Sequence, residues 1–231
     1  MIGMNRIKIF VGPCASGKTK AAIQLARTLM SDGKKVAAFK AFIDTRGVAA
    51  RLNHLISRDG KDVVATRVKN ASQILGLLDD SCVLIDGIYG VPEVILIDEA
   101  QFFGRDIIRV VRQLMCWHKR IIITGLARDC FGRPFRFVPQ LMALAESGDD
   151  IAVKQALCAV CGQLGATQIQ RLIDGQPASL GKQIIVGEDH DFGKFAQAKI
   201  TYEPRCNLHH QIASTSWWRK LYFSILYRLQ N

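Results

Sequence analysis

An eight-residue segment near the start of the chain has the spacing of a phosphate-binding loop. Residues 12–19 fit the pattern G-x-x-x-x-G-K-[ST] between an apolar β-branched run and a helical pattern. Glycines let backbone N–H groups turn toward phosphate oxygens, and a helix N-terminus favours an anion. We expect the Lys18 ammonium to bridge the β- and γ-phosphates and the Thr19 hydroxyl to bind Mg²⁺. The nucleotide-binding residues expected here are Gly12, Pro13, Cys14, Ala15, Ser16, Gly17, Lys18 and Thr19.

Two adjacent carboxylates end a second apolar run. Asp98 and Glu99 follow residues 94–97, which have the pattern of a strand buried on both faces. Ligands of parallel sheets bind at the carboxyl ends of the strands. Asp98 is therefore expected to hold Mg²⁺ through its water shell, and Glu99 to act as a general base beside the phosphates. A solvated turn is the alternative, which the phosphate loop disfavours.

Four soft donors form two closely spaced pairs late in the chain. Cys158 and Cys161 give C-x-x-C, and Cys206 and His209 give C-x-x-H. Such pairs present both side chains to one point, and a closed set of four suits a structural, tetrahedral Zn²⁺. His210 competes for the fourth position, although the spacing favours His209. Reduced, unligated cysteines are the alternative.

The elements that would position these residues alternate between strands and helices, which indicates an α/β fold with a mostly parallel sheet. Strands are predicted at 7–11, 36–39, 94–97 and 120–124, with a weaker candidate at 83–85, and helices at 18–30 and 106–117. Composition shifts near residue 150. We expect a P-loop domain at 1–150, a zinc-anchored module at 151–212 and an aromatic, basic tail at 213–231.

Composition limits the remaining possibilities. No apolar run is long enough to cross a membrane, and the N-terminus lacks the features of a secretory signal. Seven cysteines, an odd number, favour reduced thiols in the cytoplasm. The net charge of +11 attracts polyanions but is dispersed, so a surface that steers nucleotides is favoured over a nucleic-acid site. The tail could lie on a membrane interface, bind a partner subunit, pack on its own chain or fray.

The order of the motifs resembles that of the type II thymidine kinases. The phosphate loop is followed by F-K-A-F-I-D-T-R at 39–46, S-R-D-G at 57–60 and I-D-E-A-Q-F-F at 97–103. Next come G-L-A-R-D-C-F-G-R-P-F at 125–135, a segment at 141–146 like the family's next helix, C-A-V-C-G at 158–162, Q-R-L-I-D-G-Q-P-A at 170–178 and Y-E-P-R-C-N-L-H at 202–209. The phosphate loop alone is widespread, whereas D-E-A-Q-F-F with the later metal motif is far more specific.

The resemblance implies transfer of the ATP γ-phosphate to the 5′-hydroxyl of thymidine or deoxyuridine, with Mg²⁺, a structural zinc and a homotetramer. Gln101 then joins the ATP-binding residues, and a zinc-anchored lasso holds the base. The implied substrate-binding residues are Asp44 and Arg46 near the phosphates and sugar, Tyr202 over the base, and Phe102, Leu126 and Phe135 in an apolar pocket. Ordinary core packing is the alternative for the last three.

The chain also departs from the family pattern. Ala127 replaces an aspartate, Cys130 a pocket phenylalanine and Ile169 a threonine, and Cys14-Ala15 stands where methionine and phenylalanine are usual. The I-G-G turn before the lasso tyrosine is not intact, and 189–200 looks like an insertion. The catalytic half therefore matches better than the base pocket.

Two other functions remain open at this point. A nucleic-acid-stimulated ATPase with a structural zinc also fits a basic chain with D-E-A-Q, although a helicase needs a second motor domain. A zinc-dependent binding protein with a decayed kinase site is the other, and the intact Lys18, Thr19, Asp98 and Glu99 argue against it.

Overall fold

The computed structural model describes residues 7–43, 53–57, 60–79, 91–145, 150–178 and 199–211. Its central feature is a six-stranded sheet in the order β5-β2-β6-β7-β1-β8, in which every pairing is parallel. The strands are β1 (Ile7–Val11), β2 (Val36–Ala41), β5 (Thr66–Val68), β6 (Val94–Asp98), β7 (Arg120–Gly125) and β8 (Ile151–Val153). The α/β fold class expected from the alternating patterns is confirmed.

Both faces of the sheet are buried, because successive side chains of a strand point to opposite faces. In β6, Ile95 and Ile97 join one apolar cluster, whereas Val94 and Leu96 join another. This explains the continuous apolar runs, which parallel sheets covered on both faces require. The carboxyl ends of the strands therefore share one edge, where the phosphate loop and the acidic pair lie.

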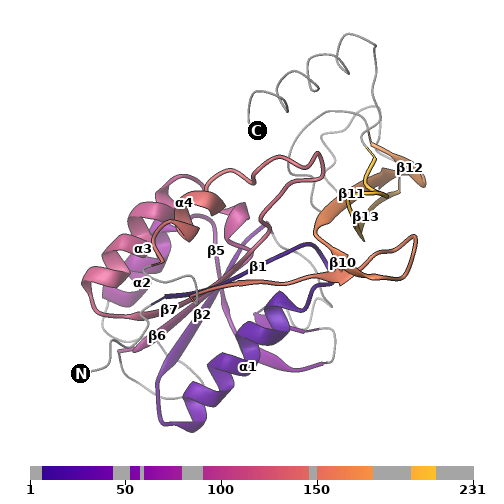
Figure 1. Cartoon of the computed structure of the whole chain (residues 1–231). Coiled ribbons are helices and arrows are strands. Elements are labelled where there is room, and N and C mark those ends of the chain that lie inside the picture. The colour runs from indigo at the N-terminus through magenta and orange to yellow at the C-terminus, as the bar shows by residue number, and fades with distance from the viewer. Residues whose placement is uncertain are drawn as a thin grey trace.

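Helices cover both faces (Figure 1). Helix α1 (Lys18–Ser31) packs on one face through Ala22, Ile23 and Ala26. Helix α3 (Asp106–Cys116) packs on the other through residues that include Ile107 and Val110, and it is accompanied by α2 (Ser72–Asp79) and α4 (Val138–Met142). A 3-10 turn, η2 (Ala100–Phe102), follows β6. This two-sided arrangement fixes the start of α1 against the end of β6.

The helix expected at 141–146 lies at Val138–Met142 instead. Pro139 sits in its first turn, where proline's fixed φ and missing N–H are tolerated, so the helix begins earlier than the motif suggested. Residue 146 lies outside the described residues, as do the strand candidate at 83–85 and the tail at 213–231.

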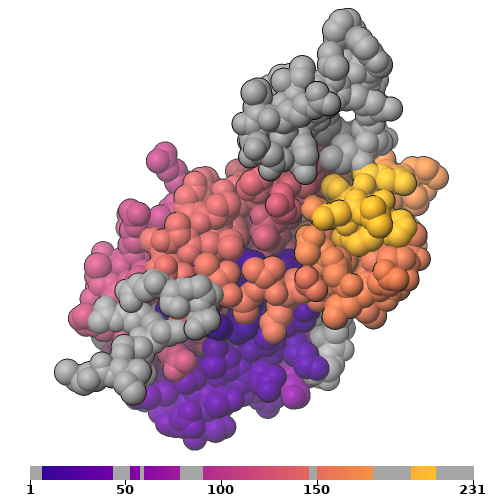
Figure 2. Space-filling view, in the orientation of Figure 1, coloured from indigo at the N-terminus to yellow at the C-terminus, as the bar shows by residue number. Residues whose placement is uncertain are grey.

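A set of small antiparallel sheets follows the central sheet. One pairs β9 (Ala156–Leu157) with β10 (Leu164–Ala166), and another has the order β12-β11-β13. The latter comprises β11 (Gln168–Ile173), β12 (Gln176–Pro177) and β13 (Ile200–Arg205). In Figure 2 this orange-to-yellow part adjoins the sheet unit, with indigo atoms from the start of the chain visible between the two.

The connection between the two parts runs through β8. Residues Ile9, Phe10 and Val11 of β1 pair with Ile151, Ala152 and Val153 of β8, so the central sheet continues three residues beyond the expected boundary at 150. The division of the chain into domains remains a prediction. A separate hairpin of β3 (His54–Ile56) and β4 (Asp62–Val64) packs on the face that α1 covers. Within the described residues, no helix combines the length and apolarity needed to cross a membrane.

Candidate active site and metal centre

The phosphate loop connects β1 to α1, and two of its side chains donate hydrogen bonds to its own backbone. Gly17 takes φ 78° at the N-cap of α1, a left-handed conformation that favours glycine. No side chain caps this helix start, so its first N–H groups have no side-chain cap as a partner. The Lys18 ammonium, only 5% exposed, donates to the Pro13 carbonyl at 2.7 Å, and the Ser16 hydroxyl donates to the same oxygen at 2.9 Å. The loop is therefore closed by its own side chains and leads into a helix N-terminus without a side-chain cap, the kind of site that favours phosphate groups.

The main chain directly after β8 packs against the phosphate loop. The Lys154 N–H donates to the Val11 carbonyl at 2.7 Å, and the Lys154 carbonyl lies so near Gly12 that a Cβ there would be 2.3 Å from its oxygen. Glycine at position 12 is required by this close approach as well as by any phosphate. The main chain that enters the second module thus forms one wall of the phosphate loop.

The acidic end of β6 meets the start of α1. Thr19 Oγ1 donates to Asp98 Oδ1 at 3.2 Å, although the two residues are 79 positions apart. This separation fits the expected arrangement, in which the Thr19 hydroxyl would bind Mg²⁺ directly and Asp98 would hold the ion through its water shell. Asp98 is buried and accepts a second hydrogen bond, from the Thr124 hydroxyl of β7. These contacts leave the carboxylate oriented toward the loop.

Glu99 is held in place by hydrogen bonds to Thr124 and Gln101. It takes φ 51°, its N–H donates to Thr124 Oγ1 at 3.0 Å, and its Oε2 accepts from Gln101 Nε2. The other end of that amide, Gln101 Oε1, accepts the Leu126 N–H at 3.0 Å. A non-glycine residue in the left-handed region is strained, and such strain concentrates at functional sites. Glu99 and Gln101 are 4% and 2% exposed, so the carboxylate is desolvated and directed.

The expected pocket residues divide into two groups. Phe135 is buried in the larger apolar cluster of the sheet unit, and its place in a substrate pocket stays a prediction. Phe102 and Leu126 are only partly buried against that cluster, beside the Glu99–Gln101 pair. Tyr202 lies in β13 opposite Arg171 and is 38% exposed. Asp44 and Arg46 lie outside the described residues, so their roles remain predictions.

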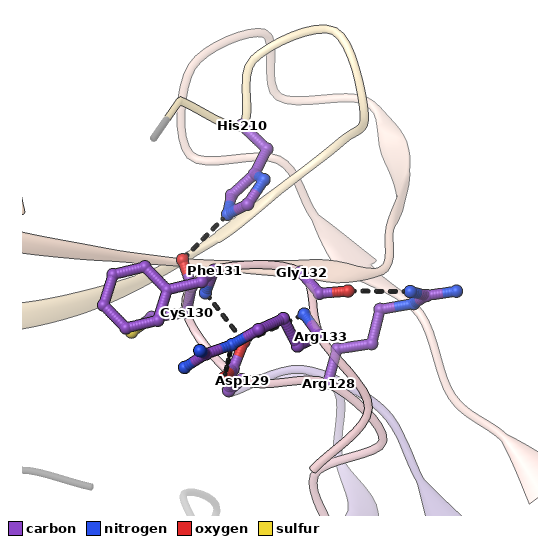
Figure 3. Close-up of polar contacts among 7 residues, drawn as sticks. All are labelled: Arg128, Asp129, Cys130, Phe131, Gly132, Arg133 and His210. Carbon is purple, nitrogen blue, oxygen red and sulfur yellow. Dashed lines mark hydrogen bonds and ion pairs between the residues drawn. The ribbon is translucent and has the colours of Figure 1, made fainter. Parts of the chain in front are cut away.

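A tight turn at 128–134 follows β7 at the same edge (Figure 3). The fully buried Asp129 organises it: Oδ1 accepts the N–H groups of Phe131 and Arg133, both at 2.9 Å, and Oδ2 accepts Arg133 Nε at 2.8 Å. The guanidinium groups of Arg133 and Arg171 lie 4.9 and 5.0 Å from the centre of the Phe131 ring. Three acceptor contacts to one carboxylate make the turn rigid.

The four predicted metal ligands meet at one point. The donor atoms of Cys158, Cys161, Cys206 and His209 all lie within 4.8 Å of one another. Tetrahedral zinc with Zn–S bonds of about 2.3 Å places its donors about 3.5–3.8 Å apart, so three sulfurs and one imidazole nitrogen at these separations fit that ion. His209 contributes Nδ1, which lies 3.7 Å from Cys158 Sγ and 3.1 Å from Cys206 Sγ. A Cys₃His cluster suited to structural zinc is therefore present.

The surroundings of Cys158 favour its thiolate form, as its lowered pKa shows. Burial alone would raise the pKa of the Cys158 thiol, but N–H groups of Cys161, Cys206 and Val160 outweigh this and lower the pKa to about 5. Thiolate is the form that binds a metal.

His210 is not part of the cluster of four donor atoms, which includes His209. Its Nε2 lies 3.0 Å from the Cys130 carbonyl oxygen, and because a carbonyl only accepts, Nε2 carries the proton (Figure 3). The choice that spacing favoured between His209 and His210 is thus supported by geometry.

Several residues of this region were not found from the sequence. Thr124, Asp129 and Lys154 are the clearest cases. Thr124 lies near the end of β7, the strand next to β6 in the sheet. Its position beside Asp98 therefore depends on the strand order, which the sequence does not give. A signal existed for Asp129, since the run D-C-F-G-R has the aspartate and glycine that favour a turn.

A phosphate loop opens α1, and a carboxylate ends the buried strand β6, which is separated from β1 by β7 alone. Together these two features define the P-loop fold class. In this chain the fold is followed by small antiparallel sheets and a Cys₃His cluster suited to zinc.

Comparison with known proteins narrows this class. The model of the family described as thymidine kinase matches residues 5–210. A thymidine kinase from Coprothermobacter proteolyticus is 36% identical over 207 residues, which cover 89% of this chain and 90% of that protein. The chain belongs to the thymidine kinase family, and it is a kinase. The resemblance found from the sequence motifs is confirmed, and the nucleic-acid-stimulated ATPase is not favoured.

Proposed function

We propose that the chain transfers the γ-phosphate of ATP to the 5′-hydroxyl of thymidine or deoxyuridine. Family membership supports this activity. The observation that carries it is that Thr19 contacts Asp98 while Thr124 contacts both Asp98 and the N–H of Glu99. Kinase chemistry needs a phosphate cradle, a metal-binding acid and a base for the acceptor hydroxyl, and all three converge at the carboxyl edge of the sheet.

In this proposal each residue has a separate task. Backbone N–H groups of residue 12 and residues 14–19, together with the Lys18 ammonium, hold the ATP phosphates. Thr19 and Asp98 would hold Mg²⁺, which supplies charge neutralisation at the phosphates when bound. Glu99 accepts the proton of the 5′-hydroxyl as the oxygen forms its bond to the γ-phosphorus. The bond from that phosphorus to the β–γ bridging oxygen breaks, and ADP leaves with the electron pair.

The local contacts support the assignment of Glu99 rather than Asp98 as the base. Asp98 Oδ1 is engaged by two hydroxyl groups, from Thr19 and Thr124. Glu99 is directed by the Gln101 amide, whose other end is fixed to the Leu126 N–H beside the expected acceptor pocket. We therefore place Gln101 as a residue that orients the base, in addition to its expected contact with ATP.

The remaining elements of the proposal follow from the family. Phe102, Leu126 and Tyr202 surround the acceptor, Asp44 and Arg46 contact phosphates and sugar, and the enzyme is a cytoplasmic homotetramer that supplies nucleotide for DNA synthesis. The Cys₃His cluster holds one Zn²⁺ with a structural role, since all four positions are taken by the protein.

The direct test is phosphate transfer from labelled ATP to a panel of nucleosides. Labelling of thymidine or deoxyuridine at the 5′ position is expected. If no nucleoside is labelled while DNA strongly stimulates ATP hydrolysis, the proposed acceptor is wrong. A thermal-shift screen with an ATP analogue ranks the nucleosides independently, because a ligand of the native state raises its stability.

A further inference from the structure

The segment that carries two zinc ligands also touches the turn beyond β7. We define residues 206–211 as the knuckle and residues 128–134 as the acceptor turn. His210 Nε2 donates to the Cys130 carbonyl at 3.0 Å, which joins residues 80 positions apart (Figure 3). His210 follows His209 directly, so any displacement of the metal-binding imidazole moves this donor.

Other contacts fix the knuckle and bring it against the turn. Gln170 Oε1, on a 2% exposed residue, accepts the Gln211 N–H at 2.7 Å, and Gln168 Nε2 donates to Asn207 Oδ1 at 3.0 Å. A Cβ at Gly132 would lie 3.6 Å from Gln168 Oε1 and 3.7 Å from His210 Cε1, which is ordinary van der Waals contact. The knuckle and the acceptor turn therefore form one packed unit.

The acceptor turn is connected in the other direction to the catalytic edge. The Phe135 N–H donates to the Ala127 carbonyl at 3.0 Å, which closes the turn next to Leu126. Leu126 in turn donates its N–H to Gln101, the partner of Glu99. Hydrogen bonds joined by short stretches of main chain thus connect the segment of the predicted zinc ligands, through Cys130, to the candidate base.

We propose that His210 is a positioning residue that transmits the geometry of the zinc knuckle to the acceptor turn and so sets nucleoside affinity. This inference rests on the proposed kinase function. In this proposal the zinc site stabilises its own module and also fixes the acceptor turn, because the knuckle contacts the Cys130 carbonyl through His210. Most of the residues expected to contact ATP, 12–19, take no part in the contacts described above, so this link is expected to act on the nucleoside rather than on ATP.

The experiment compares the full-length, zinc-loaded wild type with three variants. His210→Ala removes the donor, His210→Gln restores an N–H near the position of Nε2, and Gln211→Ala is the matched control. Gln211 is exposed and contacts Gln170 through its backbone N–H, which the control retains. Zinc content, amide hydrogen exchange of residues 128–134 without nucleoside, and KM for thymidine and ATP are measured for each.

We expect His210→Ala to keep its zinc, to exchange faster at residues 128–134 and to raise the KM for thymidine roughly 2- to 10-fold, the range of one neutral hydrogen bond. The KM for ATP should stay unchanged, and His210→Gln should recover most of the loss. Equal effects in Gln211→Ala, parallel changes in both KM values, or faster exchange with an unaltered thymidine KM would each overturn the proposal. Amide hydrogen exchange of residues 128–134 does not require turnover. An inactive wild type would therefore refute the proposed function, while the exchange rates would still test the contact between the knuckle and the acceptor turn.

Discussion

Thr19 Oγ1 and Asp98 Oδ1 are 3.2 Å apart, so the first turn of α1 and the last residue of β6 face one point. Thr124 fixes this arrangement from β7, since its hydroxyl contacts Asp98 and receives the Glu99 N–H. The Asp98 carboxylate thus accepts from two threonine hydroxyls, whereas the Glu99 carboxylate accepts from the Gln101 amide. The first prediction tests whether the two carboxylates have different roles.

Glu99→Gln should lower turnover by about 10²–10⁴-fold, the contribution of a general base, with ATP affinity nearly unchanged. The substitution keeps size and removes basicity. Steady-state kinetics with thymidine and ATP, combined with a titration of an ATP analogue, measures both quantities. Asp98→Asn is the comparison and should impair Mg²⁺ dependence and nucleotide use together. If Glu99→Gln retains turnover or loses only ATP binding, Glu99 is not the base, and Asp44 becomes the next candidate.

The purified protein should contain close to one zinc per chain, and Cys161→Ala should lose it. Metal binding energy at such a site is folding energy, so the second module should unfold at lower denaturant than the sheet unit. Elemental analysis and limited proteolysis report the two effects. Cys116→Ala is the matched control, because Cys116 is an exposed free cysteine outside the cluster. A metal-free protein with full activity would contradict the structural role.

Gly12→Ala should destabilise the protein by about 1–3 kcal/mol, the usual cost of overpacking, and should weaken ATP binding. The new Cβ would lie 2.3 Å from the Lys154 carbonyl oxygen, where φ is also +153°. Chemical denaturation and an ATP-analogue titration measure the changes. Gly76→Ala, in α2 with nothing within 4 Å, provides the control and should be stabilising by about 0.5–1 kcal/mol. Equal stability of the two variants would show that the loop can move away from Lys154.

Cys130 should react slowly with thiol reagents at pH 8, whereas the exposed Cys116 should react fast. Burial raises the pKa of the Cys130 thiol from 9.0 to about 11. Because the unfolded state releases this proton first, the contribution of Cys130 to stability is complete below pH 9 and is lost as the pH rises toward 11. Mass-spectrometric labelling of the native and unfolded chain, with Cys130→Ala as reference, tests the assignment. Rapid native labelling of Cys130 would contradict it.

The sequence was informative where chemistry depends on neighbours along the chain. Asp98 and Glu99 could be placed at a sheet edge because a continuous apolar run ends in acid, and the zinc ligands because each pair is three residues apart. Thr124 and Lys154 could not be found this way. Their roles depend on which strands lie side by side, and β8 is too short to stand out from its surroundings.

The short outer strands of the sheet also affect how the protein behaves at high concentration. In the part of the chain that the structure describes, the sheet ends at β5 and β8, each three residues long and followed by Lys69 or Lys154. Unpaired strand edges invite pairing with another molecule, and short edges flanked by lysine resist it. With a net charge of +11, the chain should resist edge-to-edge aggregation even though its central strands are almost entirely apolar.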